Sequence, residues 1–98
     1  MRRILIDSGV LLSYYQQQEP LHQAVLAFFD QNAGQLITSP ICIAELNQRY
    51  ADLPGDFADL TLVTLSERLD IAEILSLDSD FDVYRRFRRE PFRRVALA

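Results

Sequence analysis

The chain contains no lysine, because all ten of its basic residues are arginines, and it has a single cysteine and a single histidine. Without a lysine amine, Schiff-base enzymes, P-loop nucleotide-binding proteins and phospho-acceptor receiver domains are excluded. The lone Cys42 cannot form an internal disulfide. The one histidine, His22, precedes an apolar helical pattern, and we expect it at the surface or at a boundary. Histidine-based catalysis is therefore not expected.

Long apolar segments are also missing. The longest uncharged stretch runs from Gln31 to Ala44, contains Gly34 and Pro40, and is too short to span a bilayer. Asp7 interrupts the apolar run near the start before the core of a signal peptide is complete. We therefore expect a cytoplasmic protein that has no membrane partner.

The length and composition fit one globular domain over residues 1–98. Hydrophobic residues make up 49% of the chain and charged residues 24%, so neither a disordered nor a fibrous protein is indicated. A chain of this size has little room for a second core.

Charge is unevenly distributed around the formal net value of −4. Residues 4–84 contain thirteen acids and two arginines, whereas the two ends contain eight arginines and one acid. One interpretation is a solvated acidic surface beside an arginine-rich tail. The other is an acidic cation-binding site with a fringe of arginines that attracts phosphate.

Short apolar runs predict buried strands, the first over Arg3–Asp7, the second over Leu36–Thr38 and the third over Ile71–Leu77. Glu73 in the third run must lie at an edge or at the start of the strand. A last short strand is expected over Phe92–Leu97. Helical patterns occupy Val10–Tyr15, Leu21–Gly34, Ile41–Tyr50 (after a Ser39 cap and Pro40), Asp56–Leu69 and the amphipathic Val83–Arg89. This alternation predicts an α/β fold with a central parallel sheet and helices on both faces.

Four acids are placed where the carboxyl ends of the strands would gather them. Asp7 and Asp78 follow strands, Glu45 lies one turn into its helix, and Asp59 lies in the first turn of the long helix. Clustered carboxylates repel one another, so such a site needs a divalent cation to stay ionised. Oxygen ligands without paired histidines or cysteines indicate Mg²⁺ or Mn²⁺ rather than zinc.

Each acid also has a purely structural interpretation. Asp59 complements a helix dipole, Glu45 has Arg49 one turn later, and Asp78 and Asp80 are common turn formers. Asp7 is the hardest to explain in this way, because it directly follows a buried strand and must lose its water.

Two further groups of residues stay open to more than one interpretation. Cys42 lies among apolar neighbours and is expected in the core rather than at a reactive site. The arginines near the end either contact RNA phosphates or form an exposed basic helix and tail. They are Arg85, Arg86, Arg88, Arg89, Arg93 and Arg94.

Four motifs occur in a recognisable order. They run over Ile4–Leu12, from Ile37 through Pro40 to Leu46, from Asp52 through Asp59 into Leu65–Leu69, and over Ile74–Phe81. Together they cover nearly the whole chain, and the chain resembles the PIN-domain ribonucleases, in particular the VapC-type toxins of bacterial toxin-antitoxin pairs.

The resemblance implies a PIN-like three-layer fold and a Mg²⁺- or Mn²⁺-dependent ribonuclease that cuts RNA. It implies that Asp7, Glu45, Asp59 and Asp78 are the catalytic and metal-binding acids, with Asp80 as an auxiliary metal ligand. It also implies an antitoxin protein as a partner.

One departure from the family separates two functional hypotheses. Similar family members have further helices and a strand between the Glu45 helix and Leu53, whereas this chain runs directly into Asp52. The lost edge segment would leave apolar surface and unpaired backbone exposed. We therefore expect a homo-oligomer whose interface includes Ile41–Leu53. The alternative to a ribonuclease is a non-catalytic, shortened PIN-like module that acts through self-association or a protein partner.

Overall fold

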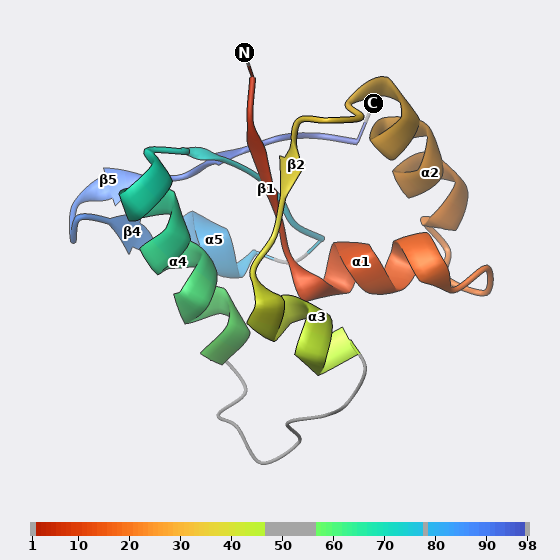
Figure 1. Ribbon diagram of the computed structural model, residues 1–98, viewed down its shortest axis with the longest axis horizontal. Helices are drawn as coiled ribbons and strands as arrows, with labels where there is room; N and C mark the ends of the chain where they lie inside the picture. The colour runs from red at the N-terminus through yellow and green to blue at the C-terminus, as the bar shows by residue number, and fades with distance from the viewer. Residues whose placement is uncertain (1, 47–56, 78, 98) are drawn as a thin grey trace.

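The computed structural model describes residues 2–46, 57–77 and 79–97 (Figure 1). Within these residues, four strands form a parallel sheet in the order β2-β1-β3-β6. The strands are β1 (Ile4–Ile6), β2 (Leu36–Ile37), β3 (Glu73–Leu75) and β6 (Arg93–Arg94). The predicted central parallel sheet is confirmed, although each strand is shorter than its apolar run.

One face of the sheet is covered by α1 (Ser8–Tyr15) and α2 (His22–Gln31). Ile4, Ile6 and Leu75 point to this face, where Val10 of α1 and Val25 of α2 contact them. Each of these five side chains is at most 2% exposed. Burial of this layer supplies much of the driving force that holds the two helices on the sheet.

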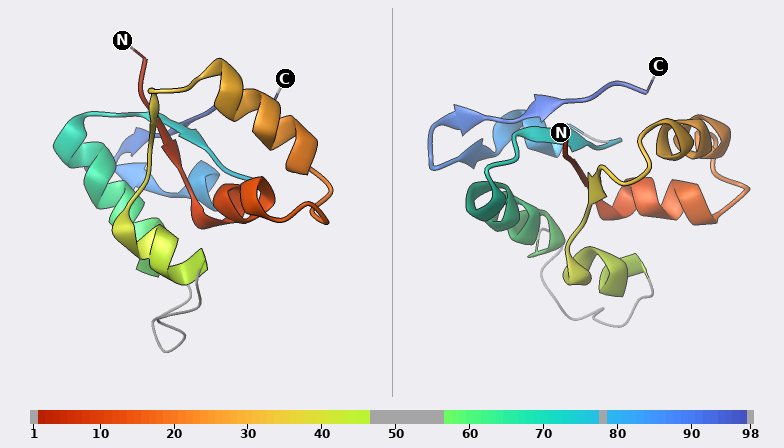
Figure 2. Two further views of the ribbon diagram at one scale, coloured as in Figure 1. Left: turned by 45° about the vertical axis from the view of Figure 1, so that its right-hand side comes forward. Right: turned by 45° about the horizontal axis from the view of Figure 1, so that its top comes forward.

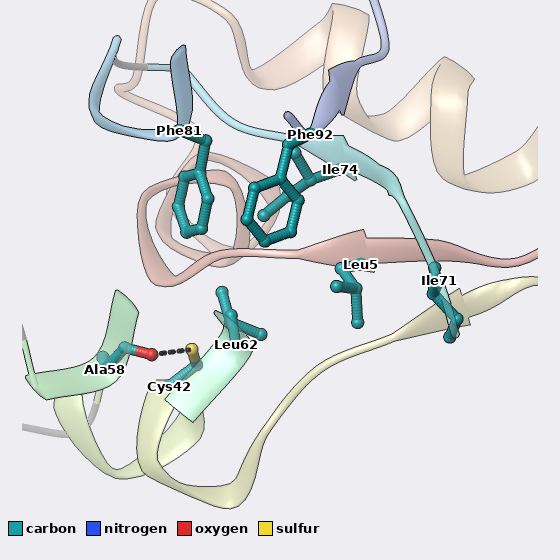
Figure 3. Packing of buried hydrophobic residues seen from close by; sticks show 8 residues of the cluster. All are labelled: Leu5, Cys42, Ala58, Leu62, Ile71, Ile74, Phe81 and Phe92. Carbon is teal, nitrogen blue, oxygen red and sulfur yellow. Dashed lines mark hydrogen bonds between the residues drawn. The ribbon is translucent and has the colours of Figure 1, made fainter. Parts of the chain in front are cut away.

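The opposite face is covered by α3 (Pro40–Leu46), α4 (Phe57–Leu69) and α5 (Asp80–Val83). Leu5 and Ile74 point to this side, against Cys42, Leu62 and Phe81 (Figure 3). Figure 2 shows α1 and α2 on one side of the sheet and α4 on the other. The expected three-layer arrangement is therefore present.

The start of α3 agrees with the sequence. Ser39 Oγ accepts the backbone N–H of Cys42 at 3.2 Å, and Pro40 occupies the first helical position, where no N–H is needed. The predicted end of this helix near Tyr50 and the predicted Asp56 cap lie outside the described residues. No helix in the described ranges has the length and apolarity required to cross a bilayer.

The predicted amphipathic helix over Val83–Arg89 is wrong. α5 ends at Val83, and Arg85–Arg86 (β4) pairs with Glu90–Pro91 (β5) as an antiparallel hairpin. Phe87 and Arg88 in the turn have φ values of 50° and 66°, which a continuing right-handed helix does not allow.

The predicted position of Glu73 is confirmed. It is the first residue of β3, where its carboxylate accepts two hydrogen bonds from the Arg2 guanidinium, at 2.6 and 3.0 Å. This ion pair joins the segment before β1 to the start of β3.

Candidate active site

Asp7 lies at the carboxyl end of β1 and is only 3% exposed. It is the N-cap of α1, where its Oδ1 accepts the backbone N–H of Val10 at 3.0 Å. Its Oδ2 accepts a short hydrogen bond of 2.5 Å from the hydroxyl of Ser76. Both bonds are donated to the carboxylate oxygens, and together they hold the orientation of the side chain.

Two hydroxyl residues that the sequence analysis did not single out complete this edge of the sheet. Ser76 directly follows β3, and because Leu75 pairs with Ile6 its hydroxyl meets Asp7. Thr38 directly follows β2, and its Oγ1 donates to the carbonyl of Ile6 at 2.6 Å. The signal in the sequence that could have identified both residues is a hydroxyl residue directly after an apolar strand.

Side-chain contacts hold the start of α4 beside the start of α3. The hydroxyls of Ser39 and Thr61 lie 2.8 Å apart, and Cys42 Sγ lies 3.9 Å from the carbonyl oxygen of Ala58 (Figure 3). Asp59, next to Ala58, lies in the first turn of α4 and is half-buried. These contacts between α3 and α4, the two helices that follow β2 in the chain, therefore hold in place the segment that carries Asp59.

The environment of Cys42 links this region to Asp7. Burial is the main reason why the pKa of the Cys42 thiol is raised, and the negative charge of Asp7 raises it further. Hydrogen bonds involving Ser39 and Thr38 act in the opposite direction. Cys42 is fully buried, as predicted, and a buried neutral thiol is a poor nucleophile.

The remaining predicted acids are only partly described by the structure. Asp80 is exposed in the first turn of α5. Glu45 lies within α3 but its side chain is outside the described residues, as is the whole of Asp78. Within the described part of the chain, no three histidine, cysteine, aspartate or glutamate side chains are grouped to hold a metal ion. The predicted acid set thus stays a prediction that depends on Glu45 and Asp78.

The prediction that His22 lies at the surface or a boundary is wrong. Its side chain is buried, 8% exposed, and its Nδ1 lies 2.7 Å from the carbonyl oxygen of Ser13. Because a carbonyl oxygen only accepts, Nδ1 must carry the proton. His22 therefore ties the start of α2 to α1 and is used structurally.

Comparison with known proteins supports the family resemblance. No protein-family model matches the chain. Over 60 residues, the chain is 37% identical to Ribonuclease VapC26 of Mycobacterium tuberculosis (strain ATCC 25618 / H37Rv). The parallel sheet with helices on both faces is consistent with the PIN-like fold that this similarity indicates. The match includes 61% of the chain but 44% of that ribonuclease, so the VapC-like chain matches less than half of its relative's length.

Proposed function

We propose that this VapC-like chain is a metal-dependent RNA endonuclease that hydrolyses phosphodiester bonds. The observation that carries the proposal is Asp7, a buried carboxylate at the carboxyl end of a central strand, held by Val10 and Ser76. In a parallel α/β sheet, this edge is where ligands bind. The match to a ribonuclease supports this choice of reaction class.

The side chains at this edge offer oxygen donors, which are the ligands that Mg²⁺ and Mn²⁺ prefer. Asp7, Glu45, Asp59 and Asp78 would hold the cation, with Asp80 as an auxiliary ligand. When bound, such a cation lowers the pKa of a water molecule and offsets charge on the leaving oxygen.

The described side chains support hydrolysis by water rather than by a side-chain nucleophile. Asp7 supplies two carboxylate oxygens in fixed positions, because both accept hydrogen bonds from the fold. The Cys42 thiol is buried and its pKa is raised, so it is not available for attack. The Nδ1 of His22 is occupied by Ser13 between α1 and α2.

Replacement of Asp7 by Asn tests this proposal. The amide side chain would keep an oxygen for the N–H of Val10, so the helix cap survives while the negative charge is lost. We expect Asp7→Asn to abolish Mg²⁺-dependent cleavage of labelled single-stranded RNA. The matched control is Asp30→Asn, which removes the same charge from an exposed position of α2.

Melting experiments with Mg²⁺ separate the ribonuclease from the non-catalytic module. A cation at 100 times its Kd stabilises the folded state by about 2.7 kcal/mol. The melting temperature of the parent protein should rise with Mg²⁺, and that of Asp7→Asn should not. Equal cleavage by the parent and Asp7→Asn would overturn the proposed mechanism.

A toxin role extends the same proposal. The partner would be an antitoxin that places a cationic side chain among the acids at the Asp7 edge, where a charge-assisted hydrogen bond is strongest. An RNA substrate and a free thiol at Cys42 both suit the cytoplasm. Co-expression with the neighbouring gene product tests the partner: a complex that protects RNA supports it, and failure to bind contradicts it.

We also propose a homo-oligomer. Ile43 on α3 and Leu60 on α4 are 48% and 47% exposed, although both are large apolar side chains on contacting helices. Ile43 falls within the predicted Ile41–Leu53 interface, of which residues 47–53 lie outside the described residues. A second copy of the chain would remove this apolar surface from water.

A further inference from the structure

A concave region lies at the opposite end of the strands from Asp7, and we call it the amino-end cavity. Its volume is about 560 Å³, within the range of small-molecule sites. Its polar lining residues are Arg2, Gln31, Asn32, Glu73, Arg93 and Arg94. Arg2 precedes β1, Glu73 begins β3 and Arg93 begins β6, so the cavity is built on the amino ends of these strands.

Tertiary structure concentrates positive charge here. Arg2 and Arg93 lie near opposite ends of the chain, and Figure 1 shows the first and last segments at the same side of the molecule. They meet because β3 pairs with both β1 and β6, which puts Glu73 opposite Arg93. The guanidinium groups of Arg2 and Arg93 act on the Glu73 carboxylate, whereas that of Arg94 is paired with Asp82. Three guanidinium groups against two carboxylates leave the lining with a net positive charge.

The three arginines of the lining differ in the hydrogen bonds that their guanidinium groups already make within the protein. Arg2 donates to Glu73, and Arg94 donates to the Asp82 carboxylate and to the carbonyl of Ser76, each at 3.0 Å. Arg93 is exposed, and among the described residues its guanidinium makes no hydrogen bond and no close ion pair; its charge acts on the Glu73 carboxylate and contributes to lowering the pKa of Glu73. Arg93 is therefore the cation that a ligand can engage without breaking an existing bond.

The remaining lining residues of the amino-end cavity supply amide groups and apolar surface, which a nucleotide base can contact. Asn32 is held by a 2.8 Å hydrogen bond from its Nδ2 to the carbonyl of Phe28, which leaves its amide oxygen as an acceptor. Gln31 adds a second amide beside it. Phe28 and Val95 supply apolar surface. Phosphate contacts by arginines and base contacts by amides are the usual division of labour in nucleic-acid sites.

We infer that the amino-end cavity binds a phosphate-bearing ribonucleotide, with Arg93 as the main phosphate contact. The choice of RNA rests on the proposed function, in which a substrate strand must extend beyond the bond that is cut. Arg2 and Asp7 are separated by about 17 Å along β1, so the two ends can contact one strand at different nucleotides. Arg94 lies between them, because its guanidinium reaches the carbonyl of Ser76.

Binding is measured by fluorescence anisotropy with a labelled single-stranded RNA and with excess EDTA, so that no cleavage occurs. Arg93→Gln should weaken binding roughly three- to tenfold and reduce the slope of log affinity against log salt by about 0.7. The control is Arg89→Gln, which makes the same charge change at an exposed position outside the cavity. It should bind like the parent.

A second variant is predicted to change the RNA affinity in the opposite direction. Glu73→Gln removes the one carboxylate of the lining and releases Arg2, so it should tighten RNA binding. Equal affinities of Arg93→Gln and Arg89→Gln, or no tightening in Glu73→Gln, would overturn the inference. A parent protein that does not bind RNA would also overturn it.

Competition with AMP identifies the source of the ribonucleotide. Tighter binding of RNA than of AMP assigns the cavity to the substrate strand, and equal binding assigns it to a free nucleotide. Both results require the Arg93 effect. Because the assay contains EDTA, its outcome is independent of whether Asp7→Asn abolishes cleavage, and failure of one proposal is distinguishable from failure of the other.

Discussion

At the scale of single residues, Asp7 serves the fold and the proposed chemistry through the same two oxygens. Oδ1 caps α1, a role worth about 1 kcal/mol, and Oδ2 is held by Ser76. A carboxylate with both oxygens fixed needs little reorganisation to receive a cation. The position of Asp7 follows from the local sequence, whereas Ser76 is recognised as its partner only after the strands have paired.

Ser76 is predicted to position Asp7. Ser76→Ala should lower the RNA cleavage rate roughly 10- to 100-fold, the usual cost of removing a group that orients a metal ligand. It should also shift the Mg²⁺ dependence of cleavage to higher concentration. Ser76→Thr keeps the hydroxyl and should restore both quantities. A cleavage rate of Ser76→Ala equal to that of the parent would show that the hydrogen bond is only structural.

At the scale of elements, the β4–β5 hairpin is fastened to the end of α4 by one buried arginine. Arg86 is 4% exposed, and its Nη2 donates to the carbonyl of Ser66 at 3.1 Å and to Asp70 Oδ1 at 2.8 Å. Its Nη1 lies 3.4 Å from Glu90 across the hairpin. The expectation that all six late arginines are either exposed or bound to phosphate is therefore wrong for Arg86.

Arg86→Ala should lower the free energy of unfolding by about 1–3 kcal/mol, because it leaves the buried carbonyl of Ser66 without this donor. Asp70 and Glu90 are largely exposed and regain water, so their loss of a partner adds little. Urea unfolding measures the difference. Arg89→Ala should change the free energy by less than about 0.5 kcal/mol. Similar values for both variants would contradict the role of Arg86 in holding the β4–β5 hairpin against the end of α4.

At the scale of the whole molecule, the sheet separates two kinds of surface. Asp7 lies at the carboxyl ends of the strands, whereas Arg2 and Arg93 lie at the amino ends. The charge pattern along the chain had allowed either a cation site with a basic fringe or a simple basic tail. Three of the basic residues, Arg2, Arg93 and Arg94, line a cavity together with Glu73, whereas Arg85, Arg88 and Arg89 are exposed, so both interpretations stay open.

The Arg2–Glu73 ion pair predicts how stability depends on pH. The hydrogen bond from Arg2 is the main reason why the pKa of Glu73 is lowered in the folded state. A lowered pKa stabilises the protein above the ordinary value of about 4.3 and loses that effect as the pH falls through the folded value. Glu73→Gln should therefore cost up to about 1 kcal/mol at pH 7.

Once the pH falls below the lowered pKa of Glu73 in the folded state, the parent and Glu73→Gln should approach the same stability, since Glu73 is then protonated in both states of the parent. Urea unfolding at a series of pH values tests this. A difference that persists unchanged into acid would mean that the ion pair is not its source.

The proposed homo-oligomer gives the second prediction at this scale. Light scattering at micromolar concentration should report at least twice the 11.3 kDa chain mass. Ile43→Glu puts a charge on the exposed apolar face of α3 and should reduce the mass to that of one chain. Ala27→Glu, at an exposed position of α2, is the control. A folded parent with the mass of one chain would overturn the proposal.

The buried face of α4 differs from the face that hydropathy predicts. Helical spacing alone predicts an apolar face through Phe57, Leu60, Val63, Thr64 and Leu65, but the fully buried positions are Ala58, Leu62 and Ser66. Leu60 is 47% exposed. Ser66 is buried because its hydroxyl is satisfied by the carbonyl of Val63 at 2.6 Å. Hydropathy alone does not reveal that a polar residue has found such a partner.

Local chemistry let the sequence by itself determine the α/β class, the order of the main strands and helices, and the cap at Ser39. These features depend on periodicity and on neighbours within a few residues. Only the tertiary structure decided that Ser76 holds Asp7, that Arg86 is buried, and that Arg2 joins Arg93 around Glu73. Each of those contacts joins segments that are remote in the chain, and their meeting is set by strand order and register.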